Sequence, residues 1–221
     1  MIIAIDGPAG SGKSTIAKML ASKLSLTFMN TGSFYRGVTL AYLRSLGGNP
    51  DGSGGKTPDL TDEAAIVAFA ATVPLDYRNS HLYIGEEDVE RYLRTDAVEA
   101  IVARLSAIVE VRHIVNGKIR EVASNTGVVC EGRDMTTVVF PNADYKFYLD
   151  ASAKSRAKRR FDQGTSNLSL EAIEKTIAER DEVDRNKKEG SLKIAEDATY
   201  IDTSDLTIDT VCDMIVSKIH L

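Results

Sequence analysis

A glycine-rich loop near the start of the chain limits its possible folds more than any other feature. Residues 7–14 read GPAGSGKS, fit the pattern G-x-x-x-x-G-K-S/T and follow the apolar residues 1–5. Glycine lets successive backbone N–H groups turn inward around an anion, and a following helix directs its positive N-terminus at the same point. The alternative is a glycine-rich turn without a ligand. A strand before the loop and a helix after it favour phosphate binding.

Two polar residues at the end of this loop have defined roles in phosphate binding. Lys13 reaches the β- and γ-phosphates of a nucleoside triphosphate, and the Ser14 hydroxyl can bind magnesium. The loop therefore predicts a nucleotide at one known point, but it leaves the reaction open.

Composition narrows the class of protein. The 221 residues suit one domain, with or without an inserted lobe, and 43% apolar and 27% charged residues are typical of a soluble globular chain. Asp6 interrupts the first apolar run and no run approaches about 18 residues, so we expect no leader, no membrane span and a cytoplasmic location. The net charge of −5 argues against general nucleic-acid binding.

Apolar runs alternate with helical periodicity along most of the chain. Beyond the strand at 1–5, the spacing predicts helices from the loop to about residue 25, at 33–46 and from 208, and strands at 26–29, 128–131, 145–149 and 200–201. Five strands that alternate with helices predict a three-layer α/β fold with a parallel sheet. Cys130, in a strand, and Cys212, in a helix, lack the spacing of a metal site or disulfide framework and are expected in the core.

The middle of the chain departs from this alternation. It predicts a capped helix at 61–71, short β segments at 73–77, 81–84 and 87–93, and one helix at 95–124. The β segments indicate a small antiparallel ribbon, and therefore an inserted lobe. The glycine-rich stretch 47–58 is expected to be a flexible connection without chemistry.

Polar residues follow two strands of the predicted sheet, at the edge where ligands of parallel sheets bind. Residues 30–36 offer a helix N-terminus, two hydroxyls and Arg36 for a second anion, although a capped helix with a solvated arginine has the same pattern. Gly132, Arg133 and Asp134 follow the strand at 128–131. An ion pair between Arg133 and Asp134 is disfavoured because adjacent strand residues point to opposite faces.

A run of cations follows the strand at 145–149. The residues are Lys154, Arg156, Lys158, Arg159 and Arg160. A solvated helix face is the usual meaning of such a run, but beyond a strand end in a phosphate-binding chain it favours a mobile lid that brings positive charge over the γ-phosphate. Asp150, at the end of the strand, is either a magnesium-binding acid or a helix cap. Residues 179–187 alternate in charge and predict an exposed helix with i,i+4 pairs.

Five segments in order resemble bacterial cytidylate kinases over nearly the whole chain. They are residues 7–14, 31–36, 93–95, 131–141 and 180–186, of which the stretch EGRDMTTVVFP is the most discriminating. The resemblance implies a P-loop kinase with sheet order 2-3-1-4-5, transfer of the γ-phosphoryl group of ATP to CMP or dCMP, magnesium dependence and a monomer that acts on small molecules in pyrimidine metabolism. It also implies a core at 1–60 and 95–221, an inserted nucleoside-monophosphate-binding lobe at about 61–94 and a helical lid at about 153–168.

The resemblance assigns roles residue by residue. The ATP site comprises Gly7, Pro8, Ala9, Gly10, Ser11, Gly12, Lys13, Ser14 and Thr15, with magnesium held at Ser14 through the nucleotide and water. The CMP site comprises Thr31, Tyr35, Arg36, Arg112, Arg133, Asp134, Arg180 and Asp184. Within it, Arg112 and Asp134 read the base and Asp184 contacts the ribose. The catalytic cations are Lys13, Arg133, Arg156 and Arg160.

Three positions depart from the family pattern. Ala103 stands where a serine often reads the base, with Ser106 one turn later, and Val183 and Lys187 stand where arginines are frequent. Lysine lacks the two-pronged geometry of arginine. The change at Ala103 affects the predicted contact to the base. The changes at Val183 and Lys187 affect the predicted contacts to the phosphate and ribose.

Two alternative functions remain open at this stage. The nearest is another small phosphoryl-transfer enzyme, such as a UMP/CMP, adenylate or shikimate kinase. A second is a nucleotide-regulated switch or nucleic-acid motor whose basic run at 154–160 binds a polyanion, but the chain has no Asn-Lys-x-Asp motif and no clear Walker-B acid pair. ATP consumption that depends on CMP distinguishes the kinase from both.

Overall fold

The computed structural model describes residues 1–162, 164 and 168–220. The chain forms two compact units, one made of Met1–Met29 and Thr126–Leu221 and the other of Asn30–Asn125. Each unit is described separately. No helix within the described residues is both long enough and apolar enough to cross a membrane.

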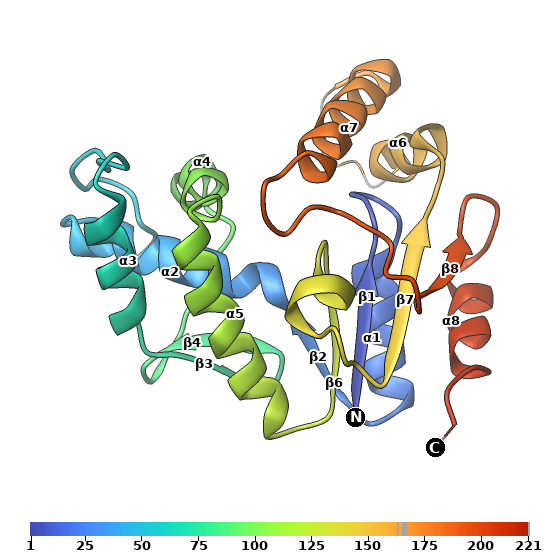
Figure 1. The fold of residues 1–221 in the computed structure, drawn as a ribbon. Helices are drawn as coiled ribbons and strands as arrows, with labels where there is room; N and C mark the ends of the chain where they lie inside the picture. Colours follow the sequence, from blue (N-terminus) through green and yellow to red (C-terminus); the bar gives the residue numbers. More distant parts are fainter. Residues whose placement is uncertain (163, 165–167, 221) are drawn as a thin grey trace. The chain divides into compact units, whose positions relative to one another are not determined.

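The first unit is built on a five-stranded sheet in the order β2-β6-β1-β7-β8 (Figure 1). The strands are β1 (Ile2–Asp6), β2 (Thr27–Asn30), β6 (Val128–Gly132), β7 (Tyr145–Asp150) and β8 (Thr199–Asp202). β1 pairs in parallel with β6 and β7, and β7 pairs in parallel with β8. The predicted parallel α/β fold and its 2-3-1-4-5 strand order are therefore confirmed.

Helices α1 (Lys13–Lys23) and α8 (Ile208–Val216) pack together and share the main apolar core with the sheet. Ile16 and Leu20 of α1 meet Ile5 of β1 and Phe147 of β7 in this core. Cys130 and Cys212 are both fully buried, as expected. The burial of these apolar faces against one another is the main stabilising contribution of the unit.

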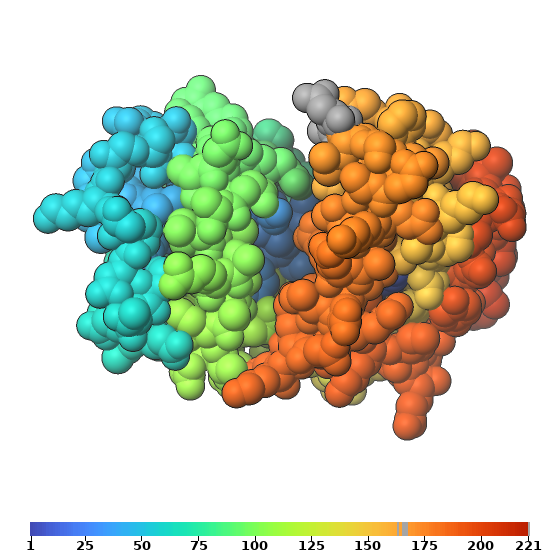
Figure 2. All heavy atoms as spheres, turned by 90° about the horizontal axis from the view of Figure 1, so that it is seen from above, coloured from blue at the N-terminus to red at the C-terminus, as the bar shows by residue number. Residues whose placement is uncertain are grey.

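Helices α6 (Ala153–Asp162) and α7 (Leu170–Arg185) pack against each other through Ala157, Ile173 and Ile177. Figure 2 looks down on this end of the unit and shows the atoms of the two helices side by side. The predicted lid at 153–168 begins with α6. Its positions 163 and 165–167 lie outside the described residues.

The second unit contains four helices and a three-stranded antiparallel ribbon in the order β3-β4-β5. Its elements are α2 (Thr31–Ser45), α3 (Glu63–Thr72), β3 (Leu75–Arg78), β4 (His81–Ile84), β5 (Glu87–Asp88), the 3-10 turn η1 (Glu90–Tyr92), α4 (Asp96–Leu105) and α5 (Val109–Ser124). The Asp62 side chain caps α3 by accepting a hydrogen bond from Ala65 N, as predicted. Gly37 lets α2 approach the ribbon, because a Cβ at this position would lie 2.3 Å from Leu82 Cδ2. The predicted antiparallel ribbon is confirmed, but its third segment, expected at 87–93, is a strand only at Glu87–Asp88 and continues into η1.

The single helix expected at 95–124 is wrong. Helix α4 ends at Leu105 and α5 begins at Val109, with Ile108 in an extended conformation between them. Val98, Leu105, Ile108, Val111 and Val115 are all buried. From Leu105 to Val115 these residues recur every three or four positions across the break, so periodicity alone could not locate it.

Candidate active site

The glycine-rich loop has the backbone conformation that anion binding requires. Gly7, Gly10 and Gly12 have φ angles of 149°, 80° and 90°, all in the region that favours glycine. At Gly7 a Cβ would also lie 2.0 Å from Leu149 O, so a larger residue cannot fit there. Gly12 is the N-cap of α1 and leaves the helix N-terminus open toward the loop.

Lys13 lies within this loop rather than extending into solvent. Its Nζ donates hydrogen bonds to Pro8 O at 2.6 Å and Ser11 Oγ at 3.4 Å, and the residue is only 4% exposed. Burial, followed by the charge of Arg133, lowers the pKa of Lys13 from 10.5 to about 7, although three neighbouring carboxylates oppose this change. A bound triphosphate would add negative charge beside the ammonium group and favour its protonated form.

Ser14 contacts a carboxylate that sequence analysis did not select. Its Oγ donates to Glu131 Oε1 at 3.0 Å, and Glu131 is a buried residue of β6. The sequence signal was an acid near the carboxyl end of the strand that pairs with β1. Asp150, the acid that sequence analysis weighed, instead accepts from Ala151 N at 2.8 Å and from Tyr200 Oη at 3.3 Å.

The Asp184 carboxylate forms ion pairs with two cationic side chains. Arg133 Nε lies 2.8 Å from Asp184 Oδ2, and Lys187 Nζ lies 2.7 Å from Oδ1. Burial alone would raise the pKa of Asp184, but the hydrogen bonds and charges of Lys187 and Arg133 outweigh it and hold the pKa below 3.8. Two predicted CMP-site residues, Arg133 and Asp184, are therefore brought together, and Lys187 joins them despite replacing arginine.

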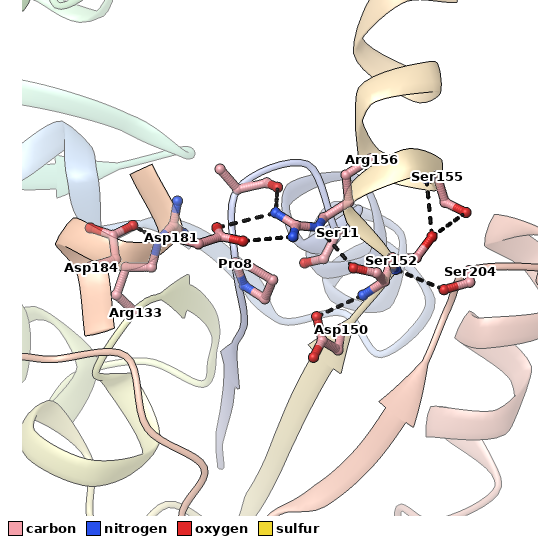
Figure 3. Close-up of polar contacts among 12 residues, drawn as sticks. Pro8, Ser11, Arg133, Asp150, Ser152, Ser155, Arg156, Asp181, Asp184 and Ser204 are labelled. Atoms are coloured by element: carbon pink, nitrogen blue, oxygen red, sulfur yellow. Dashed lines mark hydrogen bonds and ion pairs between the residues drawn. The ribbon is translucent and has the colours of Figure 1, made fainter. Parts of the chain in front are cut away.

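Arg156 is held by the protein on several sides. Its guanidinium forms a two-pronged pair with Asp181, with distances of 2.6 and 3.1 Å, and both side chains are 5% exposed. It also donates to Ala9 O at 3.1 Å and Ala151 O at 2.8 Å. Figure 3 shows the side chain running from α6 toward Asp181 beside the loop that contains Pro8 and Ser11. Arg156 thus links α6, α7 and the phosphate loop.

The other two arginines of the predicted lid differ from Arg156. Arg159 donates to Thr203 Oγ1 at 3.1 Å, and this hydroxyl donates to Ser11 O at 3.2 Å. Arg160 is half-buried and makes no hydrogen bond or ion pair with any residue that the structure describes.

Helix α7 differs from the predicted exposed helix. Asp181 and Asp184, three residues apart, form a buried face toward Arg156 and Arg133, whereas Arg180 is exposed. Among the described residues of this helix, Lys175 and Glu179 form an i,i+4 ion pair, with Lys175 Nζ 4.0 Å from Glu179 Oε1. The alternating charges therefore include internal ion-pair partners as well as a solvated face.

In the second unit, α2 and α5 carry four residues of the predicted CMP set, of which Tyr35 and Arg112 lie against each other. Tyr35 Oη donates to Asn116 Oδ1 at 2.9 Å, and the Arg112 guanidinium lies 5.3 Å from the Tyr35 ring centroid. Thr31, the first residue of α2, is buried near the helix N-terminus. Arg36 is not simply solvated, because its Nε lies 2.8 Å from Glu99 Oε1.

Ser106, considered as a replacement for the missing serine at position 103, turns back on its own helix. Its Oγ donates to Ala103 O at 3.2 Å, at the C-terminal end of α4. The hydroxyl is therefore occupied locally. Whether it reads a base remains a prediction.

No group of three or more His, Cys, Asp and Glu residues suited to a metal occurs among the described residues. Ser14 Oγ and Glu131 Oε1 bring a hydroxyl and a carboxylate oxygen together at the end of the phosphate loop. A magnesium ion held mainly by phosphate oxygens and water needs no larger set of protein ligands.

A parallel sheet of this order, with a glycine-rich loop between β1 and α1 and a buried lysine in that loop, defines a P-loop kinase. The family model described as cytidylate kinase matches residues 3–221. The chain belongs to the cytidylate kinase family, and it is an enzyme.

Relatives of known name agree with this membership over the full length. The chain is 40% identical over 223 residues to the cytidylate kinase of Borreliella burgdorferi strain ZS7, covering 100% of this chain and 97% of the relative. It is 39% identical over 224 residues to that of Borrelia hermsii, covering 100% and 99%. A crystal structure of an uncharacterized protein from Eubacterium ventriosum has a similar fold, with a TM-score of 0.54, 13% identity and coverage of 98% and 96%.

Proposed function

We propose that this protein transfers the γ-phosphoryl group of ATP to CMP or dCMP, giving ADP and CDP or dCDP. The buried Lys13 in its glycine-rich loop, within a chain of the cytidylate kinase family, carries this conclusion. A coupled assay of ADP formation tests it directly, because ATP consumption must depend on the added nucleoside monophosphate.

The reaction needs no covalent enzyme intermediate. In the proposed mechanism an acceptor phosphate oxygen attacks the γ-phosphorus in line, while Lys13, Arg133 and Arg160 stabilise the charge of the transferring group. Arg156, predicted as a fourth catalytic cation, is engaged by Asp181 and Ala9 and would contribute by holding the loop.

Each part of the acceptor has proposed partners. The phosphate is assigned to Thr31, Arg36, Arg133 and Arg180, the base to Arg112 and Asp134, and the ribose to Asp184, while Tyr35 belongs to the CMP site without a separate assignment. The hydrogen bonds from Arg133 and Lys187 support the ribose assignment, because they orient the Asp184 carboxylate and keep it ionised as an acceptor.

CMP is expected to be used with a kcat/KM about 5- to 150-fold higher than that of UMP. The cytosine amino group can donate to the Asp134 carboxylate, whereas uracil presents an oxygen there, and a buried mismatch of this kind costs about 1–3 kcal/mol. Initial rates across CMP, dCMP, UMP, AMP and shikimate measure the difference. Equal kcat/KM for CMP and UMP would contradict the assignment of Asp134.

The variant Asp134→Asn separates base reading from general damage. Its amide can donate to the uracil oxygen, so the ratio of CMP to UMP turnover should fall while KM for ATP stays unchanged. Ser106→Ala is the companion variant for the unresolved base contact. An altered CMP to UMP ratio would assign the Ser106 hydroxyl to the base.

We further propose that magnesium binds beside the phosphates near Ser14 and Glu131. A hydroxyl and a carboxylate 3.0 Å apart supply the oxygen donors that this ion prefers, and water and phosphate complete its coordination. Bound magnesium would neutralise charge on the triphosphate. Glu131 would orient the Ser14 hydroxyl and accept hydrogen bonds from water on the ion.

The variant Glu131→Gln is expected to raise the magnesium concentration for half-maximal activity about tenfold, in line with losses at other supporting residues of metal sites. Titration of Mn²⁺ into the protein with ATP, followed by electron paramagnetic resonance, measures the ion without turnover. Asp150→Asn is the matched control and should leave the requirement unchanged. An unaltered magnesium dependence in Glu131→Gln would exclude this role.

The proposed enzyme is a cytoplasmic monomer that acts on small nucleotides, without a nucleic-acid or membrane partner. The net charge of −5 is consistent with ligands captured by local cationic groups rather than by a basic surface. Size-exclusion chromatography with light scattering checks the expected monomer.

A further inference from the structure

Asp6 is a buried acid for which the proposed mechanism has no use. It is the last residue of β1, it directly precedes Gly7 of the phosphate loop, and it is 0% exposed. A charged side chain is rarely buried without several partners, because its desolvation is costly. Its hydrogen bonds therefore indicate what keeps it in this position.

Among the described residues, the three hydrogen bonds to the Asp6 carboxylate come from two consecutive residues. Oδ1 accepts from Met135 N at 2.9 Å, and Oδ2 accepts from Thr136 N at 2.7 Å and Thr136 Oγ1 at 2.6 Å. These donors begin η2, a single π-helical turn at Met135–Val139. The carboxylate thus binds the start of one irregular turn.

Arg133 and Asp134 directly precede this turn. In the sheet, Asp6 is the register partner of Gly132, and after two further residues the chain returns to Asp6 through Met135 and Thr136. Arg133 and Asp134 are the two residues enclosed by this return. Close packing restricts the turn further, because a Cβ on Gly132 would lie 2.8 Å from the Met135 side chain.

The carboxylate also remains costly to bury in its charged form. Burial raises the pKa of Asp6 to about 6, even though the bonds from Thr136 and Met135 lower it. A residue that only filled space at position 6, the end of β1, would not need a charged side chain. Three donors on one carboxylate hold the turn in a single orientation.

We propose that Asp6 is a positioning residue for the acceptor nucleotide, because it fixes Arg133 and Asp134 at the carboxyl end of β1 where the phosphate loop begins. The inference rests on the proposed assignment of Arg133 and Asp134 to CMP. It gives Asp6 a larger effect on acceptor binding and phosphoryl transfer than on the affinity for ATP, although its charge also acts on Lys13.

Thr136→Val tests the proposal with little change in volume, because it removes one of the three donors. We expect KM for CMP to rise and kcat/KM for CMP to fall about 5- to 10-fold, with the Kd of ATP within twofold of the parent value. Thr136→Ser keeps the hydroxyl and should restore KM for CMP. Thr137→Val is the matched control, because the Thr137 hydroxyl is buried with no hydrogen-bond partner in the described structure.

Asp6→Asn is the second variant, and it replaces the charge while preserving the shape. Its amide group cannot accept all three bonds, so kcat/KM for CMP should fall at least tenfold, with a smaller change in ATP affinity by calorimetry because the lost charge also acts on Lys13. Circular dichroism melting checks that both variants are folded. Equal losses of CMP and ATP affinity, or a lower Tm with unchanged KM for CMP, would overturn the positioning role.

Arg133→Ala and Asp134→Asn distinguish failure of the inference from failure of the function on which it rests. If these variants leave CMP turnover unchanged, the acceptor assignment is wrong and the positioning role falls with it. If they impair CMP use while Thr136→Val and Asp6→Asn behave like the parent, the acceptor assignment stands and only the role of Asp6 is refuted.

Discussion

Replacing Lys13 with alanine is expected to lower kcat for phosphoryl transfer about 10²- to 10³-fold, the loss typical of a preorganised donor to developing charge. Lys13 Nζ lies inside the phosphate loop, 2.6 Å from Pro8 O, so it needs little movement to meet a β- or γ-phosphate oxygen. Stopped-flow or coupled measurement of ADP at saturating ATP and CMP gives kcat. Turnover within tenfold of the parent enzyme would refute the role of Lys13.

The Lys13→Ala variant should remain folded. The pH dependence of its stability, compared with that of the parent protein, tests the lowered pKa of Lys13. The pKa of Lys13 is about 7 in the folded protein and near 10.5 when unfolded, so the unfolded chain binds the extra proton between these values. The contribution of Lys13 therefore makes the parent more stable as pH rises from about 7 toward 10.5. Urea unfolding measures the free energies of unfolding of the parent protein and of Lys13→Ala. As pH rises through this window, the difference between them should change in favour of the parent.

The sheet was predictable because its central strands β1 and β6 are mostly buried and its order followed from the family resemblance. The helix break at Ile108 was not predictable from spacing, because the residues on both sides remain buried at helical intervals. A turn that keeps apolar residues at helical spacing cannot be detected from that spacing. Extended backbone at one residue was enough to divide the helix.

The phosphate loop was predictable because its residues are adjacent in sequence and its glycines have a local conformational purpose. The partners of that loop are remote. Ser14 and Glu131 are 117 positions apart, and Asp6 and Thr136 are 130 positions apart. Such pairs depend on strand register, so the residue types alone did not reveal Glu131 or Asp6 as parts of the site.

Asp181→Ala is expected to lower the free energy of unfolding by about 3–5 kcal/mol, because it leaves the buried Arg156 guanidinium without its charged partner. The two oxygen–nitrogen distances of 2.6 and 3.1 Å and the 5% exposure of each side chain place this pair out of solvent. Urea unfolding monitored by circular dichroism measures the loss. Lys175→Ala is the control, because its pair with Glu179 is 4.0 Å long and exposed and should change stability by less than about 0.5 kcal/mol.

A double variant distinguishes loss of the pair from loss of packing. Arg156→Met combined with Asp181→Leu removes both charges while keeping apolar volume, so it should recover much of the stability lost in Asp181→Ala. It should still bind ATP less tightly, because Arg156 also donates to Ala9 O of the phosphate loop. Arg160→Ala, by contrast, should retain stability and lose kcat. If Arg160→Ala destabilised the protein and Asp181→Ala did not, the structural and catalytic roles of the two arginines would be reversed.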